Sequence, residues 1–200
     1  MKKITMMLAL IASTTFIANA QKIKKQEGKV DPLQGEEVLK IQFRYDDMGI
    51  GKNLTEEEYI ERKVTEYNED EPGRGDEWKE KWINDRESRF EPKFMELFNK
   101  YAEKAGIEGI KEGPSNYTLT VHTYYTEPGF NVGVVRKPAH IHVKYIITKT
   151  GTNDVIVEYD QKKVPGSQAM GYDFDTGTRI SESYAKAGKG FGKMLSKKLK

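Results

Sequence analysis

Apolar and polar residues alternate along four stretches of the chain, the pattern of strands that bury one face. Apolar residues fall at every second position in 37–45, and the same period recurs in 117–125, 139–149 and 155–160. The turn-forming residues 150–153 separate the last two stretches, so we expect these stretches to pair as a hairpin. One apolar face per strand predicts a sheet that is covered on one side and open on the other.

Helical spacing of apolar residues marks the rest of the chain. It predicts helices at 55–67, around Trp78 and Trp82, from Pro92 to Gly106, and at 179–199. Thr55 and Glu58 form the capping-box pattern that starts the first of these. In the last one, Gly188, Gly190 and Gly192 predict close packing against a neighbouring element. A phosphate-binding loop is the alternative for these glycines, but such a loop belongs between a strand and a helix.

These elements predict an α/β (α+β) two-layer sandwich, with a roughly four-stranded, mainly antiparallel sheet and helices on one face. The expected domain covers residues 37–200 and carries a helical insert at about 46–83. The preceding segment 21–36 is polar and contains glycine and proline, which predicts a flexible tether.

The first twenty residues have the pattern of an export signal. Lys2 and Lys3 precede an apolar run, 4–17, that is too short to span a bilayer, and Ala18 and Ala20 provide the small residues of a cleavage site. We therefore expect a signal peptide at 1–20 and an exported protein, most simply periplasmic, with full secretion as the alternative. No second apolar run is long enough for a transmembrane segment in the mature chain.

Composition narrows the function classes. The chain has no cysteine, which excludes disulfides and the lipid-bearing cysteine of bacterial lipoproteins. Without residues 1–20 it has 31 basic and 31 acidic residues, so its charge does not favour a nucleic-acid partner. The sequence also lacks the Gly-x-Ser-x-Gly pattern that marks the nucleophilic serine of many hydrolases.

The segments GVVRKPAHIHVKYIIT and ESYAKAGKGFGKML, with the order of elements, resemble bacterial envelope auxiliary-lipoprotein-like domains of the transport and envelope-assembly type. The resemblance covers 37–45 and 84–199; the lipidated cysteine of those domains is missing, and residues 46–83 are additional. It implies a non-enzymatic structural or binding role in the periplasm. It implies no catalytic residue.

All three histidines, His122, His140 and His142, fall on the expected open face of the sheet. Imidazoles at positions i and i+2 point the same way, and with Asp160 nearby such a set has the chemistry of a site for zinc or another divalent ion. The simpler interpretation is a set of polar residues on a solvated face, with no cofactor. The expected hairpin register, which pairs Lys144 with Glu158 and His142 with Asp160, places these groups together.

The same face mixes aromatic, apolar and polar side chains, as contact surfaces do. We expect its partner-binding residues to be Thr120, Tyr124, His142 and Ile146. An envelope protein or a second copy of the chain is the expected partner. The lysines near the end of the chain also allow weak peripheral contact with an anionic membrane. They are Lys193, Lys197, Lys198 and Lys200.

The sequence therefore predicts an exported, non-enzymatic binding or envelope-assembly protein. The alternative is a metal-dependent or carboxylate-based envelope hydrolase, which needs a cleft and an oriented base that the sequence does not identify.

Overall fold

The computed structural model describes residues 22–132, 135–166 and 175–199. The expected signal peptide at 1–20 lies outside these residues. The strands are β1 (Lys24–Gly28), β2 (Val38–Arg44), β3 (Gly49–Ile50), β4 (Leu54–Thr55), β5 (Glu108–Ile110), β6 (Tyr117–Glu127), β7 (Phe130–Val132), β8 (Val135–Lys137), β9 (His140–Lys149) and β10 (Val155–Pro165). The helices are α1 (Glu56–Asp70), α2 (Arg74–Asp85), α3 (Glu91–Ala102) and α4 (Thr176–Lys198), with short 3-10 helices at Asp31–Leu33 and Glu103–Ala105 and a π-helix at Arg86–Phe90.

One mixed sheet of eight strands forms the centre of the molecule, in the order β1-β10-β9-β6-β2-β5, with β3 beside β6 and β4 beside β3. Strand β2 runs parallel to both of its neighbours, β5 and β6. The pairs β6–β9, β9–β10 and β10–β1 are antiparallel. The predicted mixing of α and β elements is confirmed, but the expected four-stranded sheet was too small. The additional strands have only two or three residues or, in β1, are exposed throughout, so they carry no hydrophobic alternation to reveal them.

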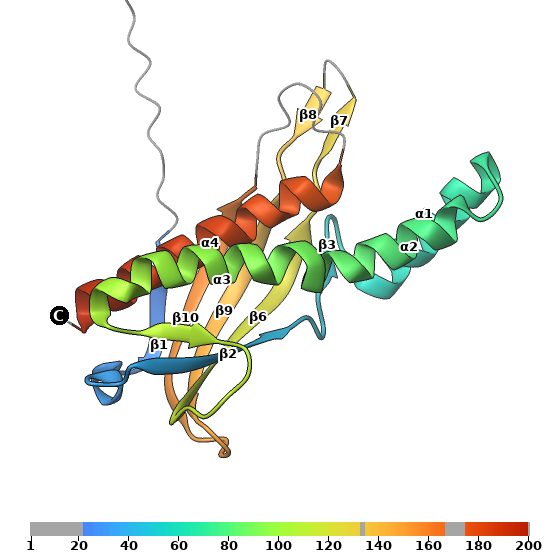
Figure 1. Ribbon diagram of the computed structural model, residues 1–200. Helices are drawn as coiled ribbons and strands as arrows, with labels where there is room; N and C mark the ends of the chain where they lie inside the picture. Colours follow the sequence, from blue (N-terminus) through green and yellow to red (C-terminus); the bar gives the residue numbers. More distant parts are fainter. Residues whose placement is uncertain (1–21, 133–134, 167–174, 200) are drawn as a thin grey trace, which may run out of the picture.

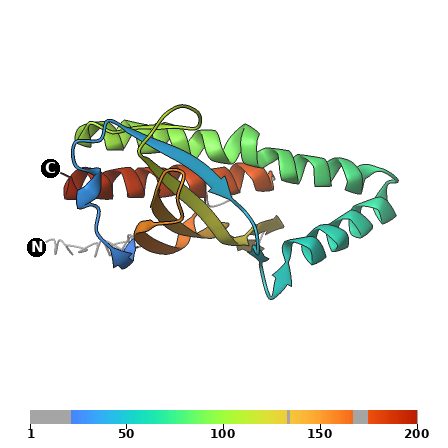
Figure 2. The ribbon, with the colours of Figure 1, turned by 90° about the horizontal axis from the view of Figure 1, so that it is seen from below.

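Helices α3 and α4 lie side by side across one face of this sheet (Figures 1 and 2). Between the two layers lies the apolar core, in which Phe94 and Phe98 of α3 and Tyr184, Phe191 and Leu195 of α4 meet the inward side chains of the strands. The inward side chains of the central strands are Leu39, Ile41, Leu119, Val121, Ile141, Val143, Tyr145, Ile147, Val157 and Tyr159. The predicted inward faces of these strands are therefore confirmed, except at Val155, whose side chain is 46% exposed.

Two glycines set the distance between the covering helices. A β-carbon at Gly188 would lie 2.2 Å from the carbonyl oxygen of Phe94, and one at Gly192 would lie 2.7 Å from that of Phe98. Both contacts involve the backbone of α3, which cannot move aside as a side chain can. Close helix packing, and not a phosphate-binding loop, accounts for these glycines.

Helices α1 and α2 form an arm that projects beyond the sheet (Figures 1 and 2). The expected capping box is present: Glu58 N donates to Thr55 Oγ1, and Thr55 N donates to a carboxylate oxygen of Glu58. Trp78 and Trp82 stack with ring centroids 5.6 Å apart and pack against Tyr59. These aromatic side chains are a small core for the arm.

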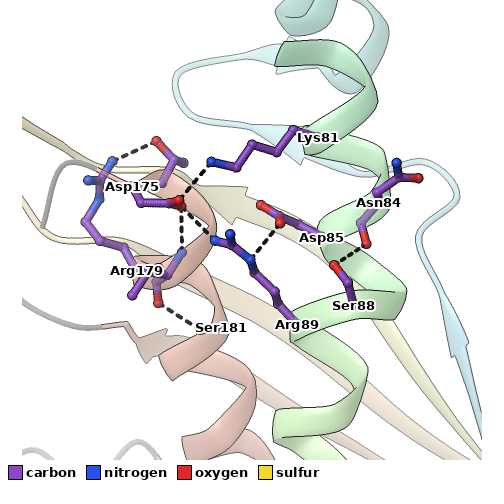
Figure 3. Close-up of polar contacts among 10 residues, drawn as sticks. Lys81, Asn84, Asp85, Ser88, Arg89, Asp175, Arg179 and Ser181 are labelled. Carbon is purple, nitrogen blue, oxygen red and sulfur yellow. Dashed lines mark hydrogen bonds and ion pairs between the residues drawn. The ribbon is translucent and has the colours of Figure 1, made fainter. Parts of the chain in front are cut away.

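A polar cluster fixes the arm to the start of α4 (Figure 3). Asp175 caps α4 by accepting a hydrogen bond from Thr178 N, and it also accepts from Lys81 of α2 and Arg89 of the π-helix, at 2.9 and 3.0 Å. Burial alone would raise the pKa of Asp175, but these hydrogen bonds hold it well below its usual value. The buried carboxylate of Asp85 pairs with Arg89 at 3.0 Å. Helix α4 is thus held by charge-assisted contacts as well as by its apolar face.

Part of the expected tether is ordered structure. Residues 24–28 form β1, which pairs with β10, and Val30 and Leu33 are buried in the core. The segment 21–36 looked like a linker because its few apolar residues show no period.

The hairpin of β9 and β10 has a different register from the expected one. Asp160 lies opposite Lys144, and Glu158 lies opposite Ile146. Lys144 still forms an ion pair with Glu158, across the diagonal at 3.4 Å. The two registers differ by two residues, so every side chain keeps its face, and matching the faces alone could not distinguish them.

Candidate functional site: the uncovered sheet face

A bulge in β6 places two consecutive tyrosines on the sheet face that the helices leave uncovered. The pairing of β6 with β9 shifts between Thr123 and Tyr125. Thr123 points to the helix side, where its hydroxyl bonds that of Tyr184 at 2.8 Å. Tyr124 and Tyr125 contact groups of the open face instead. Because a bulge adds one residue to one strand, it changes the alternation that the sequence pattern implies.

Five rings follow one another across the open face. Tyr124 lies between His122 and His142, with centroid distances of 6.4 and 5.6 Å, and Tyr125 lies 4.5 Å from His142 and 5.6 Å from His140. We call these five side chains the aromatic row. Except for His122, which is buried, they are partly exposed. The row therefore presents ring surfaces to solvent from two adjacent strands.

The histidines of the row have different environments. His122 Nδ1 lies 3.5 Å from the guanidinium of Arg44, and its Nε2 lies 3.0 Å from the carbonyl oxygen of Asp46. Because the guanidinium can only donate and the carbonyl can only accept, these contacts select the tautomer with hydrogen on Nε2. His142 has no such arrangement, since its Nε2 is buried without a hydrogen-bond partner in the described structure.

Burial makes His140 and His142 poor proton acceptors. It lowers the pKa of His140, and, together with the neighbouring His140, it lowers the pKa of His142 to about 4. At neutral pH both rings are uncharged. Burial and the hydrogen bond to Asp160 raise the pKa of Tyr124, so its hydroxyl stays protonated. These groups offer ring surface and hydrogen bonds rather than acid–base chemistry near neutral pH.

A polar pocket of about 490 Å³ adjoins the row. Tyr124 forms one wall and donates a hydrogen bond of 2.8 Å to Asp160. The rest of the pocket is lined by side chains of both charges. The other lining residues are Gln26, Glu27, Lys144, Glu158 and Lys162. Glu27 comes from β1, so the segment expected to be a tether supplies part of the pocket.

The expected partner-binding residues lie on this face but differ in accessibility. Tyr124, His142 and Ile146 are partly exposed, whereas Thr120 is buried and accepts a hydrogen bond from Gln42 at 2.7 Å. Sequence reasoning missed Tyr125, because the bulge that turns it outward has no glycine or proline to mark it.

The residues considered for metal binding are not gathered around one point. Among the residues that the structure describes, no group of three or more His, Cys, Asp or Glu side chains is placed to hold one metal ion. Asp160 contacts Tyr124 and lies 4.0 Å from the ammonium of Lys162.

Among the lysines expected to contact a membrane, Lys193, Lys197 and Lys198 belong to the end of α4, in the helix layer on the opposite side of the sheet from the aromatic row. Lys193 lies over the ring of Tyr101, with its nitrogen 4.9 Å from the centroid, while Lys197 and Lys198 are exposed. Lys200 is outside the described residues. No helix in the described part of the chain is long and apolar enough to cross a membrane.

Comparisons with known proteins assign no family, since neither a family model nor a curated protein matches the chain. Among solved structures, the PelC dodecamer from Paraburkholderia phytofirmans is 10% identical, with 86% of this chain and 97% of that chain covered and a TM-score of 0.38. A Xanthomonas campestris protein of the DUF330 family is 9% identical, with 87% and 91% covered and a TM-score of 0.35. TM-scores this low do not establish a common fold, so the function must be argued from the site.

Proposed function

We propose that the protein is exported to the cell envelope and acts there as a binding or assembly protein, with a protein partner docking on the uncovered sheet face. The aromatic row supports this most directly: four partly exposed rings stand together on a face that no helix covers. Aromatic side chains supply much of the binding energy where proteins meet.

The chemistry of the face favours a protein surface as its ligand. His140 and His142 are uncharged at neutral pH, so the row can be desolvated at low cost. The pocket beside it holds Lys144 and Lys162 as well as Glu158 and Asp160, which can pair with a polar rim of either sign. The N-terminal signal pattern supports the envelope as the location of such a partner. The metal-dependent form of the hydrolase alternative has no support among the described residues, where no group of three or more His, Cys, Asp or Glu side chains is placed to hold a metal ion.

Site-specific photocrosslinking in the producing cells tests this proposal. A photoreactive phenylalanine analogue at Tyr124 or Ile146 should give one discrete adduct, and the analogue at Lys197, exposed on the helix layer, should not. Combining His142→Glu with the analogue at Ile146 should abolish the adduct. A docking partner would have to remove water from the introduced carboxylate, which is costly without a counter-charge. Mass spectrometry of the adduct distinguishes a different protein from a second copy.

Absence of an adduct at both face positions, or an equal adduct at Lys197, would reject the face as the docking surface. Circular dichroism of His142→Glu is the control for folding.

A further inference from the structure

A second surface feature borders the aromatic row, where Tyr125 donates a hydrogen bond to the carbonyl oxygen of Gly51. It is a cleft of about 300 Å³ between the turn that joins β3 to β4, the first turns of α1, and the base of the β7–β8 hairpin. We call it the basic cleft. It shares no lining residue with the aromatic row or its polar pocket. In Figure 1, the hairpin and the α1–α2 arm both project from the body of the molecule.

Positive charge predominates in the basic cleft. Its cationic lining residues are Lys52, Arg62, Lys63 and Lys137, and its single carboxylate is that of Glu127. This carboxylate is buried and already satisfied, since it pairs with Lys137 at 2.6 Å and accepts a hydrogen bond from Gly129 N. Lys63 pairs with Glu66. Within the described structure, Lys52 and Arg62 have no carboxylate partner, so the cleft has cations to offer an anion.

Exposed apolar side chains stand beside these cations. Phe130, at the rim of the cleft, is 42% exposed, and Val135 of the facing strand is 54% exposed. Only two other large hydrophobic side chains in the described residues are comparably exposed, Ile83 and Val155. The hairpin is a separate two-stranded sheet in which Phe130 pairs with Lys137. The cations come from the β3–β4 turn, α1 and β8, and the apolar side chains come from β7 and β8. Cations beside exposed apolar groups are typical of surfaces that bind anionic membranes.

We propose that the basic cleft, with Phe130 of β7 and Val135 of β8 beside it, docks the protein on an anionic lipid surface. Lys52 and Arg62 meet lipid phosphates, while Phe130 and Val135 enter the boundary between headgroups and acyl chains. An acidic protein segment would satisfy the cations but would not require the exposed apolar pair next to them. This contact is independent of the sheet-face partner, so either proposal can fail alone.

Vesicle flotation tests the proposal with the processed chain, residues 21–200, whose N-terminus is first verified by mass spectrometry. Vesicles of phosphatidylglycerol and phosphatidylcholine should carry the protein upward, and those of phosphatidylcholine alone should not. Each cation near an anionic surface contributes about fivefold to binding, so Lys52→Gln with Arg62→Gln should weaken it about 25-fold. Added salt should weaken wild-type binding and have less effect on this variant.

Lys197→Gln with Lys198→Gln is the matched control. It removes the same charge from the exposed end of α4 and should leave vesicle binding within about twofold of wild type, because screening confines the attraction to nearby charges. Phe130→Ser should weaken binding without changing its salt dependence, as expected if this ring enters the lipid.

Three outcomes would overturn the proposal. One is equal binding to both kinds of vesicle, and another is an equal loss in the two double variants. The third is absence of vesicle binding together with cleft-dependent binding of labelled polyglutamate, which would assign the cleft to an acidic protein segment.

Discussion

The two faces of the sheet are built from the same strands but end in different environments. On the covered face, Tyr145 and Phe191 stack at 4.1 Å, and the glycines of α4 bring it against the backbone of α3. On the open face, His142 keeps a buried nitrogen without a partner, and the rings remain partly exposed. The covered face carries the close-packed core, although it too contains, among the described residues, buried hydroxyls without a hydrogen-bond partner, those of Tyr159 and Ser183. What distinguishes the open face is that four of its rings remain partly exposed, as natural proteins commonly leave side chains where they bind.

Deleting one ring from each face measures this difference most directly. Phe191→Ala removes a fully buried ring and should lower the free energy of unfolding by about 3–5 kcal/mol. Tyr125→Ala removes a partly exposed ring and its hydrogen bond to Gly51, and should cost about 1–2 kcal/mol. Urea unfolding of both variants checks the difference. Equal costs would mean that the open face contributes to the core as much as the covered one.

The glycines of α4 sharpen the comparison within a single helix. Gly188→Ala places a methyl group against the Phe94 carbonyl and should destabilise the protein by about 1–3 kcal/mol. Gly190→Ala is the matched control: its nearest neighbour is a side-chain atom at 3.6 Å, and the higher helix propensity of alanine should stabilise by up to about 1 kcal/mol. Thermal unfolding gives both values. Lower thermal stability of both variants would indicate that α4 is tightly packed on both faces.

Asp175 tests the polar connection between the arm and the covering layer. Asp175→Asn retains a helix-capping side chain but weakens the ion pairs with Lys81 and Arg89, which should cost about 1 kcal/mol at neutral pH. Its pKa is lower in the folded than in the unfolded protein, so its stabilisation is present above the usual pKa of aspartate and is lost as the pH falls below it. The variant should therefore lose less stability than wild type below about pH 4. Parallel acid unfolding curves for the two proteins would contradict this role.

The sequence predicted the covered face much better than the open one. Period-two alternation in 117–123 and 139–149 assigns side chains to the apolar face, and the structure buries them as expected. The open face depends on the bulge at Tyr124 and on strand β1, neither of which changes the local hydrophobic pattern enough to be recognised. The prediction of the β9–β10 register failed for a related reason: a two-residue shift changes the cross-strand partners but leaves every side chain on its face. Sites on exposed faces are defined by such details, which a single sequence encodes weakly.

His142 gives the smallest expected effect on stability and the most specific test of the open face. Its pKa falls to about 4 in the folded protein from an ordinary value of 6.5. Between these values the unfolded chain binds a proton that the folded protein does not, so stability decreases as the pH falls from 6.5 towards 4. His142→Phe removes both this proton and the unpaired nitrogen. It should be neutral or stabilising by up to about 1 kcal/mol at pH 7, with a larger gain at pH 5.

Urea unfolding at pH 7 and pH 5 measures both gains, and crosslinking from Ile146 then shows what the histidine contributes to binding. Greater stability together with a weaker adduct would mean that His142 is retained for its partner at the expense of folding. Greater stability with an unchanged adduct would remove this histidine from the docking surface. A loss of stability at pH 5 would contradict the buried environment on which the lowered pKa of His142 depends.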